Sequence, residues 1–239
     1  LIDYKLHGYW TPEDRIFDIG MTTSRAIDRL ITIIRAKRET SLPYLKELAT
    51  EQDNGNGALM RIFPLYAYLR HRPLEAWFEP IWQHSALTHG HERSAWCCLL
   101  YLRFCHYIVA HGDAFPKALE KARQDTLSVM DNKPKKQEYD ALHKLLYADF
   151  TTLARTQVQG NGYVVFSLEA VLWSLFNATD YRSAVLNAVN LGQDTDTTAC
   201  IAGAPAALSY GRESIPRNWL TALARHEEII GLGERLERI

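Results

Sequence analysis

Residues 94–109 read Ser-Ala-Trp-Cys-Cys-Leu-Leu-Tyr-Leu-Arg-Phe-Cys-His-Tyr-Ile-Val. This stretch is long enough and apolar enough to form a buried helix. Outward from it, apolar residues recur at helical spacing between Val165 and Phe176, and a third helix is predicted at roughly Ser24–Ala36, with Ser24 at its capped start. The only β-branched and aromatic run, residues 163–166, merges into a helical pattern. The sequence therefore predicts an all-α protein without internal repeats.

Composition limits the protein class. The chain has 239 residues, 47% of them hydrophobic, and a formal net charge of −1. This is enough for one globular domain, or at most two, with a large core. The near-neutral charge argues against nucleic acid as the primary partner. No run approaches the roughly 20 apolar residues that cross a bilayer, so we expect no membrane association, and residues 1–5 show no signal-peptide pattern.

The four cysteines, Cys97, Cys98, Cys105 and Cys200, form no Cys-x-x-Cys pair, which argues against structural zinc. We expect them to be buried, reduced thiols. Reduced thiols in turn favour a cytoplasmic protein.

One polar turn carries the clearest chemical signal: Gly192-Gln193-Asp194-Thr195-Asp196-Thr197-Thr198. Carboxylates and hydroxyls are the ligands that Mg²⁺ and Mn²⁺ prefer. The simpler alternative is a helix N-cap, although one Asp or Thr would suffice for that. A calcium EF-hand loop counted from Asp194 would need Gly at residue 199 and Glu at residue 205, which are Ala199 and Pro205. A divalent-metal site and a helix cap remain the two interpretations.

Small residues follow this turn from Ala199 to Ala207. They would let a helix pack closely against its neighbours and bring the metal turn to the centre of the protein. Pro205 should kink that helix or alter its hydrogen bonding.

Polar, glycine-containing segments mark further candidate sites. Asn54-Gly55-Asn56-Gly57 precedes an apparent helix, and its N–H groups could form an anion-binding nest. An ordinary turn is the alternative, and Arg61 could bind phosphate or form a structural ion pair. His89 follows Thr88 in a loop, and Asp18 is by itself a cap candidate. The lysine-rich residues 131–136 are predicted to form a solvated turn.

Together these segments resemble the ADP-ribosylglycohydrolase family, which includes the dinitrogenase-reductase-activating glycohydrolases. The resemblance covers nearly the whole chain, in the family order. Its pieces are Phe17-Asp18-Ile19-Gly20-Met21-Thr22-Thr23, Asn54-Gly55-Asn56-Gly57-Ala58-Leu59-Met60-Arg61 with Pro64, Thr88-His89, Gly162-Tyr163-Val164-Val165, and Gly192 to Gly203 with Gly211 and Pro216-x-x-Trp219.

The resemblance implies a single domain over residues 1–239, a compact orthogonal helical bundle, with a binuclear Mg²⁺ or Mn²⁺ centre. The family cleaves the bond between ADP-ribose C1″ and an arginine, serine or related acceptor. By resemblance, the metal ligands would be Asp194, Asp196 and Thr197. Asp18 and Asp194 would be catalytic, with Asp18 near the ribose as a candidate acid or base. The substrate-binding residues would be Gly55, Asn56 and Gly57 at the diphosphate, His89 at the ribose, and Tyr163 beside the bound ADP-ribose.

Two departures from the family pattern bear on this site. The family carries a second metal motif, Thr-Asp-Asp-Thr, upstream of the Phe-Asp-Ile-Gly piece, whereas only sixteen residues precede Phe17 here and none forms it. Either the segment is missing from the chain as given, or the metal site is incomplete. Gln193 also stands where the family usually has Gly.

Three functional hypotheses follow. The first is a metal-dependent hydrolase that removes ADP-ribose from a protein side chain or a related conjugate. The second is a non-catalytic member that binds ADP-ribose, neutralises an ADP-ribosylating toxin as an immunity protein, or is structural, as in a jellyfish eye-lens crystallin of the family. The third is a metallohydrolase acting on another phosphate or glycoside ester.

Overall fold

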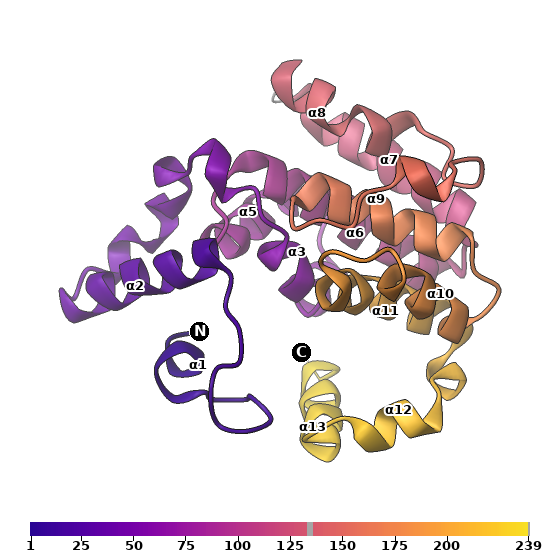
Figure 1. Ribbon diagram of the computed structural model, residues 1–239. Helices are drawn as coiled ribbons and strands as arrows, with labels where there is room; N and C mark the ends of the chain where they lie inside the picture. Colours follow the sequence, from indigo (N-terminus) through magenta and orange to yellow (C-terminus); the bar gives the residue numbers. More distant parts are fainter. Residues whose placement is uncertain (133–135, 239) are drawn as a thin grey trace.

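The protein is helical throughout the part described by the computed structural model, residues 1–132 and 136–238 (Figure 1). The α-helices are α1 (Ile2–His7), α2 (Met21–Arg35), α3 (Gly57–Arg61), α4 (Leu65–Leu69), α5 (Phe78–Ala86), α6 (Glu92–His111), α7 (Phe115–Asp131), α8 (Lys136–Tyr147), α9 (Val164–Phe176), α10 (Tyr181–Val189), α11 (Thr195–Tyr210), α12 (Arg217–Ala222) and α13 (His226–Leu236). Short 3-10 helices are η1 (Glu39–Leu48), η2 (Glu51–Asp53), η3 (Leu74–Ala76), η4 (Arg155–Gln157) and η5 (Arg212–Ser214). These residues contain no strand, so the all-α prediction is confirmed. Half of the predicted turn at 131–136, residues 133–135, lies outside the described residues.

The long apolar stretch of the sequence is the centre of the fold. It forms α6, whose residues from Glu92 to Cys105 are all buried. The helix packs against α5, α7, α9 and α11, and the ring of Trp96 stacks on Phe78 with 3.8 Å between centroids. Gly112 ends the helix in the left-handed conformation, where a side chain would be strained. The predicted buried helix is therefore confirmed, and the other helices are arranged around it.

Helix α2 begins earlier than the sequence suggested. Its first residue is Met21, and the N–H of Ser24 bonds to the carbonyl of Gly20 at 2.9 Å. Ser24 therefore lies within the first turn, and its predicted role as the cap is wrong. The buried face of α2, made by Ala26, Ile27 and Leu30, still follows the predicted helical spacing.

Helix α11 runs through Pro205 without a break from Thr195 to Tyr210. Proline has no N–H, so the carbonyl of Ile201, four residues earlier, loses its normal helical donor. The buried hydroxyl of Tyr101 on α6 donates to this carbonyl at 3.0 Å. The expected change in hydrogen bonding is therefore confirmed, because a side chain of the neighbouring helix replaces the missing backbone donor. Small side chains at Ala202 and Ala206, both fully buried, give α11 its close packing against α9 and α10.

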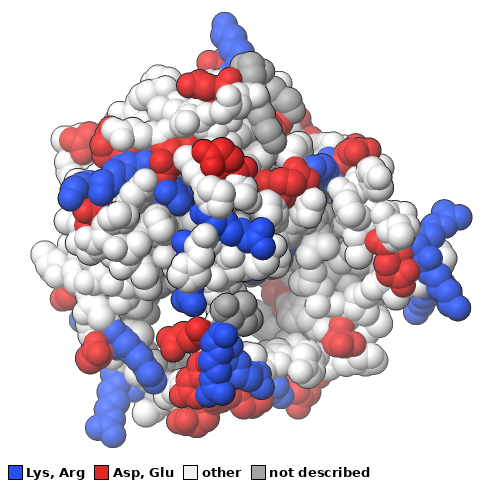
Figure 2. Space-filling view, turned by 180° about the vertical axis from the view of Figure 1, so that it is seen from behind, with Lys and Arg blue, Asp and Glu red and all other residues white. Residues whose placement is uncertain are grey.

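The two ends of the described chain meet at one side of the molecule (Figure 1). Arg225, just before α13, pairs with Asp14 at 3.1 Å and lies over the ring of Trp10. On the face seen in Figure 2, acidic and basic side chains are interspersed. None of the described helices combines the length and apolar character that crossing a bilayer needs. Cys97, Cys98 and Cys105 are buried free thiols as expected, but Cys200 is exposed because it lies on the outer side of α11.

Candidate functional site

A cavity of about 1080 Å³ lies between the N-terminal segment, the start of α2, α3 and the first turn of α11. The segment 10–20, except Asp14, forms one wall, Gly57 and Arg61 come from α3, and Asp196 and Thr197 come from α11. Asp18 and Thr88 also line it. Side chains from four separate parts of the sequence therefore face a single space that is large enough for a nucleotide-sized ligand.

The backbone before α11 turns sharply at Gly192 and Gln193, which have φ angles of 82° and 62°. The left-handed conformation at Gln193 is one that glycine adopts without strain and that most other residues adopt rarely. Asp194 then takes the N-cap position, but its carboxylate makes no capping hydrogen bond. The side chain is therefore not used as the simple helix cap that the sequence left open.

Instead, the carboxylate of Asp194 is bound by a distant residue. The side-chain Nδ2 of Asn56 donates to Asp194 Oδ2 at 2.7 Å and to the hydroxyl of Ser167 at 2.9 Å. The backbone N–H of Asn56 donates to Gly162, and the N–H of Asp194 donates to Gly160. The Asn56 turn, the loop before α9 and the start of α11 are thus joined at the edge of the cavity.

The glycines of the Asn-Gly-Asn-Gly turn make room for His89. A Cβ atom at Gly57 would lie 2.7 Å from His89 Cε1, and one at Gly55 would lie 2.8 Å from His89 Nε2. Gly55 also forms an isolated antiparallel bridge with Tyr163. The space left by these two glycines is therefore occupied by the ring of His89, and the backbone of Gly55 lies against that of Tyr163.

His89 is buried, and its Nδ1 lies 2.8 Å from the hydroxyl of Thr88. Burial, and then the nearby positive charge of Arg61, lower the pKa of His89 to about 4. The imidazole is neutral at physiological pH, so it can donate or accept a hydrogen bond but cannot supply a proton as an imidazolium.

Arg61 reaches across to the end of α5. Its Nη2 donates to the carbonyls of His84 and Ser85, at 2.9 and 3.3 Å. Within the described residues no carboxylate pairs with it, so the structural ion pair that was one alternative is absent there. Burial lowers the pKa of Arg61 to about 10. The guanidinium stays charged at neutral pH. It supplies hydrogen-bond donors to the free carbonyls at the C-terminal end of α5, beside the cavity.

Tyr163 is held by a buried arginine that the sequence reading did not single out. Arg93 donates from Nη1 to the Tyr163 hydroxyl at 3.2 Å and to Glu51 at 3.0 Å. Its Nε and Nη2 each donate a hydrogen bond to the carboxylate of Glu138. Burial raises the pKa of Tyr163, so the phenol keeps its proton. Neither spacing nor composition indicates this network, because Arg93 and Glu138 lie 45 positions apart.

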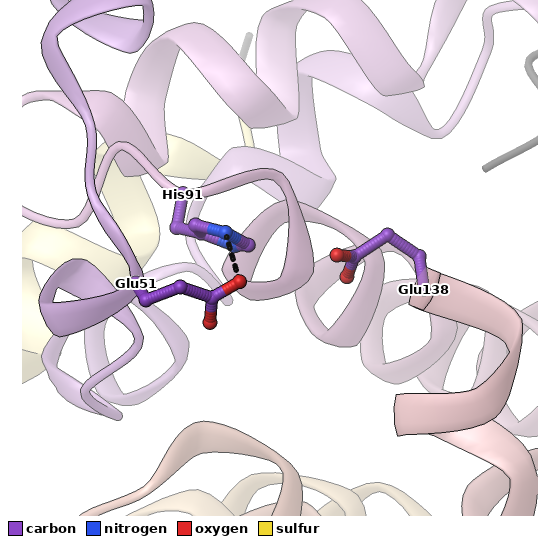
Figure 3. Close-up of side chains that lie close together, drawn as sticks. All are labelled: Glu51, His91 and Glu138. Carbon is purple, nitrogen blue, oxygen red and sulfur yellow. Dashed lines mark ion pairs between the residues drawn. The ribbon is translucent and has the colours of Figure 1, made fainter. Parts of the chain in front are cut away.

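Glu51, His91 and Glu138 bring three possible metal-ligand atoms within 4.8 Å of one another (Figure 3). Two contacts oppose a metal there. His91 Nδ1 accepts the N–H of Arg93, which leaves the imidazole proton on Nε2, the atom that faces Glu51 at 3.3 Å. Glu138 is already bound by two nitrogens of Arg93. The donor set is better described as an ion-pair network.

The turn at α11 suits a divalent cation better. It offers the carboxylates of Asp194 and Asp196 and the hydroxyl of Thr197 within one turn of helix, next to the cavity. Among the described residues, the hydrogen-bond partner of the Asp194 carboxylate is Asn56, which binds Oδ2. Oxygen donors of this kind match Mg²⁺ and Mn²⁺. Asp18 also lines the cavity and is exposed, and its backbone carbonyl accepts a hydrogen bond from the hydroxyl of Tyr4.

A family model described as ADP-ribosylglycohydrolase matches residues 2–239. The chain belongs to the ADP-ribosylglycohydrolase family. A solved structure titled "ADP-ribosylglycohydrolase-related protein complex" superposes with a TM-score of 0.71 at 26% identity, over 92% of this chain and 69% of that one. The helical architecture expected from the resemblance is thereby confirmed.

Two curated relatives are enzymes by name. The ADP-ribosylarginine hydrolase Tri1 of Pseudomonas putida (strain GB-1) is 28% identical over 99% of this chain and 58% of its own length. The ADP-ribosyl-dinitrogen reductase glycohydrolase of Rhodospirillum rubrum is 30% identical over 88% of this chain and 62% of its own. This family member thus spans about three fifths of the length of these two relatives.

Proposed function

We propose that this protein is a metal-dependent hydrolase that removes ADP-ribose from a modified protein side chain, with arginine as the favoured acceptor. The observation that carries the proposal is the single cavity lined by Asp18, Gly57, Asp196 and Thr197 in a chain of this family. The relative named ADP-ribosylarginine hydrolase supports the choice of acceptor. The cavity volume fits an ADP-ribose group entering with its acceptor.

Asp194, Asp196 and Thr197 would hold Mg²⁺ or Mn²⁺, two ions in the full centre. When bound, such an ion polarises hydroxyl oxygens and lowers the pKa of a ligated water. Asp18, which also lines the cavity, would move the proton between water and the leaving side chain, as general acid–base catalysis requires. Asp194 would act with it as the second catalytic carboxylate.

The remaining site residues would bind and orient the substrate. The turn of Gly55, Asn56 and Gly57 would lie at the diphosphate, where its two glycines would let phosphate oxygens approach the backbone. Neutral His89 would exchange a hydrogen bond with a ribose hydroxyl. Tyr163 would lie beside the bound ADP-ribose, with its hydroxyl fixed by Arg93.

The test uses the purified protein with ADP-ribosylated arginine and ADP-ribosylated serine peptides, in the presence of Mg²⁺ or Mn²⁺ and after chelation. We expect ADP-ribose release that needs the metal, prefers the arginine peptide and is abolished by Asp194→Ala. Release that persists after chelation would refute the metal-dependent mechanism, and no release from either peptide would refute the hydrolase.

A binding role is the second candidate. The cavity beside Asp196 and Thr197 is large enough to retain ADP-ribose as a bound ligand. A protein with such a site could hold ADP-ribose, or cover an ADP-ribosylating toxin or transferase, without turnover. Calorimetry with ADP-ribose separates the two roles: binding without hydrolysis supports this one, and metal-dependent turnover rejects it. For either role we propose a cytoplasmic location.

A further inference from the structure

Asn56 has little capacity left to bind a phosphate. Its side-chain amide nitrogen is committed to Asp194 Oδ2 and to Ser167, and its backbone N–H is committed to Gly162. An amide nitrogen carries two protons, and both have acceptors. Only Oδ1 remains, and it is an acceptor. A diphosphate offers only acceptors at neutral pH, so Asn56 is poorly suited to contact it.

Ser167 fixes which way the amide points. Its hydroxyl is fully buried and donates to the carbonyl of Asn161 at 2.8 Å. A hydroxyl has one proton, so Ser167 must accept from Asn56. The opposite orientation of the amide would also set Oδ1 against Asp194 Oδ2, two acceptors 2.7 Å apart. The nitrogen of Asn56 therefore faces the carboxylate, and this follows from the network rather than from an assumed assignment.

We propose that Asn56 is a positioning residue that holds the carboxylate of Asp194, and that Ser167 orients Asn56 for this task. The inference rests on the proposed role of Asp194 as a metal ligand. By occupying Oδ2, the amide fixes the carboxylate rotamer and leaves Oδ1 as the ligand atom. Hydrogen-bonded partners behind a metal ligand determine its orientation, and their loss weakens metal binding.

Burial supports this assignment over a merely structural contact. Asn56 is 8% exposed and Ser167 is fully buried, whereas Asp194 is partly buried and lies two residues before Asp196, which lines the cavity. The contact joins residues 138 positions apart. A mostly buried amide thus holds Oδ2 of the carboxylate, while Oδ1 has no hydrogen-bond partner among the described residues.

The test compares wild-type protein with Asn56→Ala and Ser167→Ala, and with Asn132→Ala as a control that removes an exposed amide far from the cavity. Isothermal titration with Mn²⁺ alone reads metal affinity without any turnover. Kinetics with an ADP-ribosylated arginine peptide then separate kcat from KM. Thermal unfolding of each variant shows which of them fold.

We expect Asn56→Ala to weaken Mn²⁺ binding by about 10- to 100-fold and to lower kcat, with KM little changed. Ser167→Ala should also weaken Mn²⁺ binding and lower kcat, but by smaller factors. This variant keeps the test decisive if Asn56→Ala does not fold. Asn132→Ala should match wild type.

A raised KM with unchanged Mn²⁺ affinity in Asn56→Ala would overturn the inference in favour of a diphosphate contact. Wild-type protein that fails to bind Mn²⁺ would also overturn it. If wild type binds Mn²⁺ and loses it in Asn56→Ala but releases no ADP-ribose, the positioning role stands and the proposed hydrolase fails.

Discussion

Gly57 illustrates how one missing side chain shapes the site. Alanine at this position would place its Cβ atom 2.7 Å from His89 Cε1 and 3.3 Å from the hydroxyl of Thr23. The ring of His89 must then move, because the backbone around it is fixed by packing. We expect Gly57→Ala to lower kcat/KM for an ADP-ribosylated arginine peptide by roughly 100-fold, the size of effect caused by a misplacement of about 1 Å.

The matched control for this substitution is Gly231→Ala. Gly231 lies in α13, and a Cβ atom there would meet no other atom within 4 Å. Alanine should leave kcat/KM unchanged and favour the helix. Equal kinetics for the two variants would show that the space beside Gly57 is not needed for the reaction.

His89 also links pH to stability. Its pKa is lowered to about 4 in the folded protein, against 6.5 for an exposed histidine. The unfolded chain therefore binds the proton more tightly, so the free energy of unfolding decreases as the pH falls from 6.5 to 4. His89 should contribute about 3 kcal/mol to this decrease. His106, whose pKa burial also lowers to about 4, adds to it.

Urea unfolding at pH 7 and pH 4.5 measures the effect. His89→Gln should reduce the loss of stability between the two pH values, while His7→Gln, at an exposed residue of α1, should leave it as in wild type. An unchanged pH dependence in His89→Gln would contradict the buried, neutral state of this histidine.

At the scale of elements, α6 and α11 depend on each other through Tyr101 and Pro205. Tyr101→Phe removes the donor to the Ile201 carbonyl, and Pro205 supplies none. A buried carbonyl without a partner costs about 1–3 kcal/mol, so we expect urea unfolding to show a loss of that size.

A second substitution checks the cause. In Tyr101→Phe with Pro205→Ala, the N–H of alanine can restore the ordinary helical bond to Ile201. The double variant should therefore be more stable than Tyr101→Phe alone, as a double-mutant cycle measures. If the effects of Tyr101→Phe and Pro205→Ala on the free energy of unfolding simply add, the Ile201 carbonyl does not couple the two residues.

The elements were largely predictable because their signals are local. The apolar run of α6 and the periodic apolar face of α9 depend on neighbours three and four residues apart, which the sequence displays directly. The start of α2 was misplaced because Ser24 is a good capping residue in general, whereas here Gly20 ends the preceding loop. Capping chemistry alone does not identify which of two nearby residues begins a helix.

The candidate site was predictable in part. Carboxylate and hydroxyl side chains that are close in sequence, such as those of Asp194, Asp196 and Thr197, by themselves indicate a possible site with oxygen ligands. The contacts of Asn56 with Asp194 and of Arg93 with Glu138 span 138 and 45 positions, and no periodicity connects such partners. Their pairing depends on how the helices pack around α6, which the sequence pattern does not specify.

For the molecule as a whole, the contact between Arg225 and Asp14 joins the segment before α13 to the wall of the cavity. Asp14 is largely exposed and Arg225 is partly buried, so the pair should contribute at most about 1 kcal/mol to stability. We expect Arg225→Ala to leave the melting temperature almost unchanged but to speed trypsin cleavage at Arg15 by up to about fivefold, the factor that corresponds to such an energy.

Mass spectrometry of the early fragments locates the cut. Arg217→Ala, at an exposed position on α12, serves as the control and should leave the rate of cleavage at Arg15 as in wild type. Equal rates for both variants and wild type would mean that the N-terminal wall is held by its other contacts, such as that of Tyr4 with Asp18.

The hydrogen bond between Asn56 and Asp194 has a consequence for how the protein reaches its native state. Its partners are 138 positions apart, so forming it carries a loop-closure entropy cost that folding of the chain between them has to offset. Helices form locally and early, whereas contacts of such high sequence separation form late. During refolding from denaturant, the circular-dichroism signal of the helices should therefore recover first, and competence to bind Mn²⁺ should return only with the final packing of α11.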